Sequence, residues 1–207
     1  MPMQQRIFEQ LEKVGLGVSE AQAHQFAEYL ALMERWNKVY NLTGITDPDE
    51  MIQRHLVESL TFKPYLKGSR IADVGSGAGL PGIPLAITSP EVELTLVESR
   101  GKKARFLRHV QGTLRLANVR VEHSRAEDLT PVPPFDTVLA RAVAALPELL
   151  TFTRHLLASD GILLVLTKAR YQSQAVELGE DTRARCVEDP VTKLLKGSLV
   201  LIETTDS

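Results

Sequence analysis

Residues 71–79 read Ile71-Ala72-Asp73-Val74-Gly75-Ser76-Gly77-Ala78-Gly79, a short apolar run that leads into three alternate glycines. An apolar run of this length predicts a buried strand, and the residues after the glycines predict a helix over 82–89. Glycine lets the backbone turn sharply and come close to a ligand, and the following helix offers its free amide ends. The segment therefore predicts a ligand-binding loop between a strand and a helix.

The chain beyond residue 70 alternates β-rich runs with helical stretches, which is typical of βαβ units around a parallel sheet. We expect strands at 70–74, 94–98, 119–123, 136–140 and 162–167, and two late strands at Arg185 to Glu188 and Leu199 to Glu203. We expect helices at 82–89, at 101–117, from Pro147 to about Ala158, and around 171–180. This order predicts an α/β fold with a mostly parallel, doubly wound sheet.

The first 65 residues have a helical pattern instead. Ile7 and Leu11 lie on one stripe at helical spacing, Ser19 with Gln22 makes a capping box, and Asp47 can cap a third helix that should end near Phe62. We therefore expect an N-terminal helical extension over residues 1–65 and a second domain over residues 66–207.

The composition is that of an ordinary globular protein. Of the 207 residues 43% are hydrophobic and 24% charged, the mean hydropathy is −0.07, and the formal net charge is −2. No apolar run approaches the ~18 residues of a membrane span, and the opening residues do not resemble a signal peptide. The single cysteine, Cys186, excludes an internal disulfide, and the scattered histidines do not have metal-ligand spacing. We expect a cytoplasmic monomer with no membrane partner and no metal.

The glycine loop is compatible with two classes of cofactor. Gly77, Gly79 and Gly82 satisfy the G-x-G-x-x-G pattern of a dinucleotide site, but Gly75 begins the loop and Pro81 removes an amide where a phosphate would need one. S-adenosylmethionine (SAM) carries no phosphate, and it needs close backbone approach and an acid for its ammonium and ribose. The sequence favours SAM, and a plain strand-to-helix turn remains the alternative without a ligand.

Acidic residues follow the predicted strands at the same edge of the sheet. Asp73 ends the first strand and Glu98 the second, where a carboxylate can accept hydrogen bonds from ribose hydroxyls. The third strand is followed by residues 124–128, Ser-Arg-Ala-Glu-Asp, which could hold an adenine edge. We therefore expect a cofactor site that includes Asp73, Gly75, Gly77, Gly79 and Glu98.

The residues after the fourth strand bear on which atom accepts a methyl group. An amine acceptor commonly requires an Asn/Asp-Pro-Pro-aromatic loop there, whereas residues 139–143 read Leu-Ala-Arg-Ala-Val. A pyrimidine carbon requires a cysteine nucleophile, and we expect Cys186 to be a small buried residue far from the cofactor strands. A hydroxyl acceptor favours a general base, and none is evident in the sequence. A ring nitrogen such as guanine N7 has a free lone pair and needs no base. The sequence is therefore compatible with a ring-nitrogen acceptor but does not prove it.

Basic residues are concentrated between Arg100 and Arg125, where eight Lys or Arg residues stand against one acid. With Phe106, Val110 and Leu114 on the core stripe of the 101–117 helix, we expect an outward basic face that contacts RNA phosphates, although a solvated helix face is the alternative. The predicted RNA-binding residues are Arg54, His55, Lys102, Lys103, Arg105 and Arg108. We expect Arg141 to touch the cofactor or place the base, and Lys168 to contact RNA phosphate, both as positioning residues rather than general bases.

A longer string extends the glycine motif: Asp73-Val-Gly-Ser-Gly-Ala-Gly-Leu-Pro-Gly-Ile-Pro-Leu-Ala86. It is accompanied by Trp36-Asn37, Asn41-Leu42-Thr43, Arg54-His55, Arg125-Ala126-Glu127 and Arg141-Ala142. Together these residues resemble the bacterial small-subunit ribosomal RNA guanine-N7 methyltransferases, the RsmG family, also called glucose-inhibited division protein B. The resemblance covers nearly the whole chain.

The resemblance implies a Rossmann-like SAM-dependent methyltransferase fold and N7 methylation of one guanine in the decoding region of 16S ribosomal RNA, with S-adenosylhomocysteine as product. Carried over by position, the SAM contacts are Gly75, Leu80, Ala126, Glu127 and Arg141. One departure is Glu58-Ser59, where the family pattern has Asp-Ser. The partner implied is 16S ribosomal RNA or the small ribosomal subunit.

Two other functions stay open at this point. A nicotinamide-dependent oxidoreductase would use the same loop class, but the chain has no Tyr-x-x-x-Lys or comparable hydride site. A non-catalytic SAM-sensing or ribosome-binding protein would bind SAM without turnover on any RNA.

Overall fold

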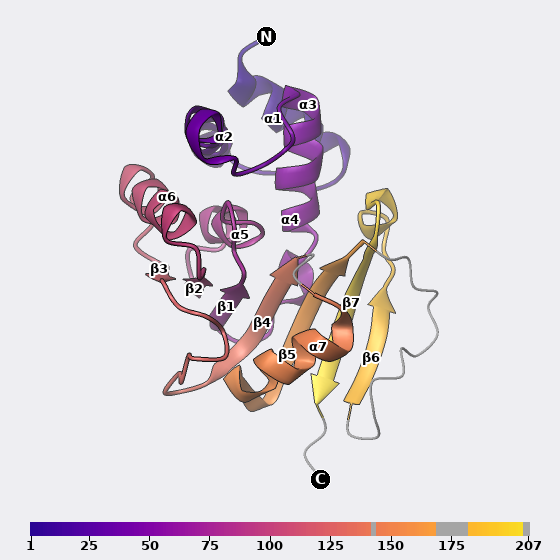
Figure 1. Ribbon diagram of the computed structural model, residues 1–207. Coiled ribbons are helices and arrows are strands. Elements are labelled where there is room, and N and C mark those ends of the chain that lie inside the picture. Colours follow the sequence, from indigo (N-terminus) through magenta and orange to yellow (C-terminus); the bar gives the residue numbers. More distant parts are fainter. Residues whose placement is uncertain (142–143, 169–181, 205–207) are drawn as a thin grey trace.

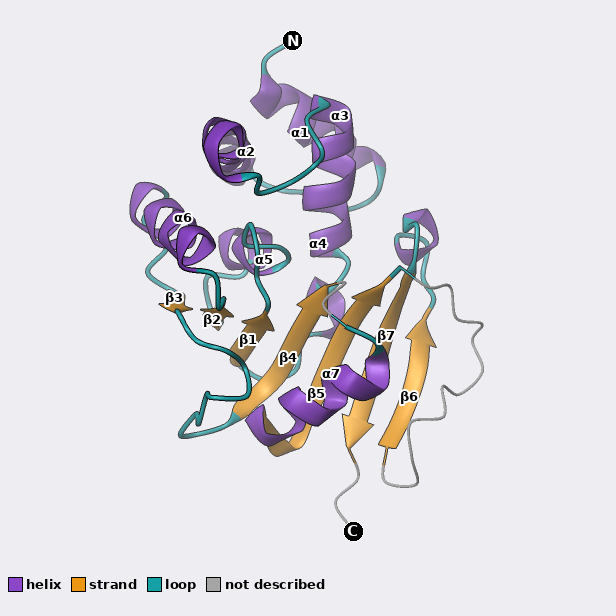
Figure 2. Cartoon of the chain, in the orientation of Figure 1, coloured by secondary structure: helices purple, strands orange, loops and turns teal. Residues whose placement is uncertain are grey.

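A mixed sheet forms the centre of the computed structural model, which describes residues 1–141, 144–168 and 182–204 (Figures 1 and 2). The strand order is β3-β2-β1-β4-β5-β7-β6. The strands are β1 (Arg70–Val74), β2 (Glu93–Val97), β3 (Val119–Glu122), β4 (Phe135–Arg141), β5 (Leu157–Thr167), β6 (Thr182–Val187) and β7 (Ser198–Thr204). Strands β1 to β5 pair in parallel, and β7 is antiparallel to both of its neighbours. The predicted α/β fold with a mostly parallel sheet is confirmed.

The strand order reverses next to β1, which pairs with β2 on one side and β4 on the other. In the register, Val74 lies beside both Val97 and Ala140, and Arg141 lies beside Leu166. Open α/β sheets bind ligands outside the carboxyl ends of the strands at such a reversal. The segments that leave β1, β2 and β4 therefore emerge side by side at the edge where a ligand is expected.

The N-terminal helices lie beyond this carboxyl edge, toward which β4 and β5 point in Figure 1. They are α1 (Met3–Lys13), α2 (Glu20–Tyr40), α3 (Pro48–Met51), a π-helix (Ile52–Val57) and α4 (Glu58–Leu60). The capping box is confirmed: the Gln22 amide donates to Ser19 Oγ (3.2 Å) and the Ser19 amide to Gln22 Oε1 (2.9 Å). Among the described residues, no helix has both the length and the apolar character needed to cross a membrane.

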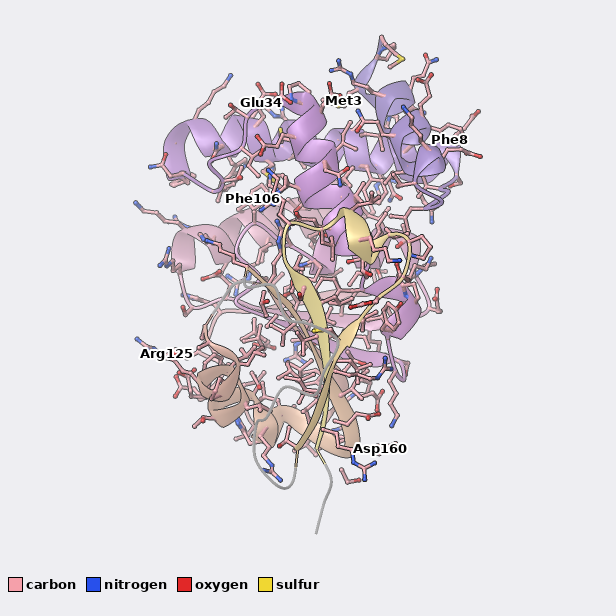
Figure 3. The ribbon with its side chains drawn as sticks, turned by 90° about the vertical axis from the view of Figure 1, so that its right-hand side faces the viewer. Met3, Phe8, Glu34, Phe106, Arg125 and Asp160 are labelled. Atoms are coloured by element: carbon pink, nitrogen blue, oxygen red, sulfur yellow. The ribbon has the colours of Figure 1, made fainter. Side chains whose placement is uncertain are left out.

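Two hydrophobic clusters cover the two faces of the sheet. On one face, Ile71 and its neighbours pack with α5 (Gly82–Thr88), α6 (Gly101–Thr113) and the N-terminal helices, and on the other face Ala72 packs with α7 (Leu146–Thr153). Phe106 of α6, labelled in Figure 3, packs on Trp36 of α2 with ring centroids 5.5 Å apart. The N-terminal helices therefore share a core with the sheet, and the division of the chain at residue 65 stays a prediction.

Three sequence predictions differ from the structure. Helix α7 ends at Thr153 and not near Ala158, because a 3-10 turn leads directly into β5, where Leu157 pairs with Phe135. Helix α6 ends at Thr113 and not at residue 117, because Arg115 takes a left-handed conformation with φ 53°. Cys186 was expected to be buried, whereas it is half-buried, because it lies on β6, the strand at the edge of the sheet. The helix predicted around 171–180 lies outside the described residues.

Candidate functional site

The loop between β1 and α5 has its shape from three glycines with positive φ: 68° at Gly75, 60° at Gly77 and 92° at Gly79. A side chain at Gly79 would meet the packed interior, because its Cβ would lie 2.5 Å from Ile83 Cγ1. A Cβ at Gly77 would have its nearest neighbours, Gly75 O and Lys103 Nζ, at 3.7 Å. Gly79 therefore faces the packed interior, whereas the side of the loop at Gly77 leaves room for a ligand.

Hydrogen bonds from below hold the loop in this conformation. The Gly75 amide donates to Val97 O (2.9 Å), and the Ser76 hydroxyl donates to Asp73 O (2.7 Å). Tyr29, a fully buried residue of α2, donates its hydroxyl to Ala78 O at 2.6 Å. Tyr29 was not identified from the sequence, because nothing in a helical segment indicates a hydrogen bond to a distant loop.

Asp73 lies beneath the loop and is fully buried. Its Oδ2 accepts a hydrogen bond from the Gly82 amide (2.9 Å) at the start of α5, and its Oδ1 has no partner among the described residues. Burial raises the pKa of Asp73 to about 7, and the Gly82 amide partly opposes that shift. A direct contact with a cofactor does not fit a carboxyl group in this position, because the loop and α5 enclose it.

Glu98 follows β2 and joins two segments of the carboxyl edge. Its Oε2 accepts from the Gly77 amide (2.9 Å) and its Oε1 from the Arg100 amide (2.8 Å), and 5% of the residue is exposed. Ala126, after β3, is buried at the same edge, and Glu127 is exposed. The predicted cofactor residues thus follow adjacent strands, at the carboxyl edge where open α/β sheets bind ligands.

A buried ion cluster lies where the N-terminal helices meet β4. Glu58 Oε1 is 3.0 Å from Arg54 Nη1, and Glu58 Oε2 is 2.9 Å from Arg141 Nη2. The pKa of Glu58 is raised by burial, and both arginines oppose the shift. The pKa of Arg141 is lowered by burial, and its Nη1 has no hydrogen-bond partner among the described residues.

A cavity of about 280 Å³ adjoins this cluster, and we call it the basic cavity. It is lined by Arg54, Glu58, Arg141, Leu166, Thr167, Lys168, Lys196 and Gly197. The structure brings together Arg54, Arg141 and Lys168, three residues that the sequence singled out separately. Glu58 entered the sequence reading only as a departure from the family pattern. Lys196 was missed, because only the antiparallel pairing of β7 with β5 places it here.

His55 is buried, with 2% of the residue exposed. Its Nε2 lies 3.2 Å from Thr43 Oγ1, and its Nδ1 has no partner among the described residues. Burial, followed by the charge of Arg141, lowers the pKa of His55 to about 4. The expected contact between His55 and RNA does not fit this structure, because the ring lies inside the protein next to Thr43.

The basic residues of α6 divide into an outer and an inner set. Lys102, Arg105 and Arg108 are exposed, whereas Lys103 is half-buried and its Nζ lies close to Gly77. The buried stripe of Phe106, Val110 and Leu114 is confirmed. Among the described residues, no group of three or more His, Cys, Asp and Glu side chains could hold a metal ion.

Comparisons with known proteins agree on one family. Residues 22–199 match the family model GidB, described as rRNA small subunit methyltransferase G. A Klebsiella pneumoniae subsp. pneumoniae protein named Ribosomal RNA small subunit methyltransferase G is 46% identical over 81% of this chain and 80% of its own length. The protein of the same name from Enterobacter sp. (strain 638) is 39% identical over 93% of both chains.

A solved structure is similar in fold. The O-methyltransferase TomG from Streptomyces achromogenes, in complex with SAM, superposes with a TM-score of 0.56 at 18% identity, covering 86% of this chain and 90% of that one. At this identity the likeness concerns the fold alone, and it supports the Rossmann-like methyltransferase architecture.

Proposed function

The chain belongs to the rRNA small subunit methyltransferase G family, and from this premise we propose that it transfers a methyl group from SAM to N7 of one guanine in the decoding region of 16S ribosomal RNA. The observation that carries the proposal is the family match over residues 22–199, which includes both the glycine loop and most of the N-terminal helices. The relatives are named for methylation of small-subunit ribosomal RNA. The guanine and its N7 atom come from the motif resemblance.

The cofactor site fits SAM in two respects. The open face at Gly77 allows close backbone approach, and the Glu98 carboxylate lies next to it at the end of β2. Asp73 acts from beneath the loop as a positioning residue through the Gly82 amide. The proposed cofactor contacts are Gly75, Gly77, Gly79, Leu80, Glu98, Ala126 and Glu127, whereas Asp73 acts through the loop and Arg141 as a positioning residue.

The chemistry requires alignment and not proton removal. SAM supplies an electrophilic methyl group on a sulfonium, and guanine N7 offers a lone pair without a proton. The buried titratable groups near the site are engaged in structure: Asp73 with the Gly82 amide, Glu58 with two arginines, and His55 with Thr43. This arrangement supports direct displacement without a dedicated general base, with Arg141 and Lys168 as positioning residues.

Basic residues of the N-terminal helices and of α6 provide the proposed contacts with RNA phosphates. Lys102, Arg105 and Arg108 are exposed, and Arg54 and Lys103 are half-buried. The product is S-adenosylhomocysteine, and the substrate is 16S ribosomal RNA or the small subunit. We further propose that the protein acts as a cytoplasmic monomer.

The test is transfer of labelled methyl from SAM to small-subunit ribosomal RNA from a strain that lacks this gene, and to intact small subunits in parallel. Nucleoside mass spectrometry should then recover labelled 7-methylguanosine. The variant Gly75→Arg, whose side chain would fill the loop, should lose both SAM binding and label.

A wild-type protein that binds SAM but labels neither substrate would contradict the proposal and favour a SAM sensor. SAM binding can be read from thermal unfolding, because a ligand at ~100 times its dissociation constant stabilises a protein by about 2.7 kcal/mol.

A further inference from the structure

The basic cavity is positively charged inside an acidic protein. Four cationic side chains and one carboxylate line it, a formal charge of +3, whereas the whole chain carries −2. They come from the N-terminal helices (Arg54, Glu58), the ends of β4 and β5 (Arg141, Lys168) and the turn before β7 (Lys196). The fold therefore gathers like charges that would repel one another unless an anion neutralised them.

The charges in the cavity are only partly neutralised by the protein. Glu58 pairs with both arginines, but neither Lys168 nor Lys196 makes an ion pair with any residue that the structure describes, and both are exposed. The buried Nη1 of Arg141 has no acceptor in the same part of the chain. Buried polar groups are nearly always hydrogen-bonded, so a guanidinium donor without an acceptor indicates a ligand oxygen.

From these observations we infer that the basic cavity binds one phosphodiester of the RNA substrate, with Lys196 and Lys168 at its mouth and Arg141 at its base. The inference rests on the proposed function, since it names the part of the RNA that this site takes. Guanidinium and ammonium groups are the usual protein partners of phosphate oxygens. Glu58 then serves as a positioning residue that holds Arg54 and Arg141 in the cavity wall.

The carboxylate of SAM is the other anion that could reach Arg141. The cavity lining contains neither a residue of the glycine loop nor Glu98, which favours the phosphodiester over the carboxylate of SAM. It is instead shared between the N-terminal helices and the β5–β7 side of the sheet, and Figure 1 shows the segment before β7 at the same end of the sheet as α4. Two exposed lysines at the mouth suit a polyanion that approaches from solvent.

The test measures binding of small-subunit ribosomal RNA in the absence of SAM, over about 50 to 200 mM salt. Lys196→Ala should raise the dissociation constant about five- to ten-fold and lower the slope of log K against log salt by about one. Lys196→Arg should restore most of the binding, because it keeps the charge. The matched control is Lys193→Ala, which removes an exposed lysine from the same segment outside the cavity lining and should bind RNA as the wild type does.

Three results would overturn the inference. The first is that Lys196→Ala binds RNA with the dissociation constant and salt slope of Lys193→Ala. The second is that Lys196→Ala weakens SAM binding and leaves RNA binding unchanged, which would assign the cavity to the cofactor carboxylate. The third is a wild type that does not bind the RNA, which would remove the proposed function as well. A wild type that binds RNA with the expected effect of Lys196→Ala, yet forms no 7-methylguanosine, would contradict only the proposed function.

Discussion

The glycine loop and the basic cavity lie at the same edge of the sheet but are built in different ways. The loop is a backbone structure: its shape depends on positive φ at three glycines and on hydrogen bonds to Asp73, Val97 and Glu98. The cavity is a side-chain structure, in which groups from distant segments meet around Glu58. A backbone site does not accept an added atom at a packed position such as Gly79, whereas a side-chain site depends on the balance of its charges. The two regions should therefore respond differently to substitution.

The largest effect is expected for Gly79→Ala in the loop. The new Cβ would lie 2.5 Å from Ile83 Cγ1, and the residue would have to keep a φ of 92°. Strained backbone and overpacking each cost about 1–3 kcal/mol, so the free energy of unfolding should fall by about 4 kcal/mol. Denaturant unfolding gives that value, and SAM titration should show a loss of binding.

The matched control for Gly79→Ala is Gly112→Ala. Gly112 lies in α6 with nothing within 4 Å of a Cβ, so alanine should leave the free energy of unfolding unchanged or raise it by up to about 1 kcal/mol. Equal stabilities for the two variants would show that the loop is less rigid than its geometry implies.

The second effect concerns Glu58→Gln in the cavity. Glutamine keeps the size of the side chain but removes the charge that faces Arg54 and Arg141, whose side chains are 23% and 15% exposed. Breaking a buried ion pair costs about 3 kcal/mol, and we expect a loss of that order in the free energy of unfolding. Glu58→Asp should lose less, because it keeps the carboxylate. If aspartate lost stability and glutamine did not, side-chain length and not charge would matter at this position.

The third effect is a pH dependence caused by His55. Its pKa is about 4 in the folded protein against 6.5 for the free side chain. Below pH 6.5 the unfolded chain therefore binds a proton at His55 that the folded protein does not bind. The stability that this site contributes is complete above about pH 6.5 and is lost as the pH falls toward 4. Relative to pH 7.5, the wild type should lose about 2 kcal/mol at about pH 5 that His55→Gln does not lose.

Comparison with His55→Gln is needed because Asp73 acts in the opposite direction. The pKa of Asp73 is raised to about 7, so the stability linked to its proton is present at low pH and lost as the pH rises toward neutrality. Measurements on the wild type by itself therefore give the sum of the His55 and Asp73 contributions to stability. The difference between wild type and His55→Gln in unfolding experiments from about pH 7.5 to 4.5 isolates the histidine, and a difference that does not change with pH would contradict its low pKa.

The sequence was sufficient for the loop because the determinants of the loop are local. Alternating glycines after an apolar run indicate a tight turn with positive φ between a strand and a helix. The position of Glu98 at the end of the next strand follows from the parallel sheet. The mostly parallel sheet and most strand positions followed from the alternation of elements. The end of α7 was misplaced, since pairing of Leu157 with Phe135 competes with helix formation there and is not visible in the residues themselves.

The cavity could be predicted only in part. Arg141 and Lys168 were expected at strand ends, but no periodicity connects Glu58 to Arg141, or Lys196 to either of them. Their meeting depends on how the N-terminal helices pack on the sheet and on the antiparallel return of β7. Burial of His55 depends on the same packing, and this is why a histidine beside an arginine in sequence was misread as a surface contact.

The smallest effect is expected for Lys102→Ala on the exposed face of α6, where neither a loop nor a cavity constrains the side chain. Lys102 Nζ lies over the ring of Tyr40 at 5.8 Å and is otherwise solvated, so the free energy of unfolding should change by less than about 0.5 kcal/mol. RNA binding should weaken about two- to three-fold, with a lower salt slope, because a solvated lysine contributes one long-range charge rather than an enclosed contact. Lys13→Ala, at an exposed lysine of α1 outside the basic segment, is the control and should bind RNA as the wild type does. If Lys102→Ala weakened binding as much as Lys196→Ala, α6 and not the basic cavity would hold the tightest phosphate contact. If its binding matched that of Lys13→Ala, the basic face of α6 would be a solvated surface.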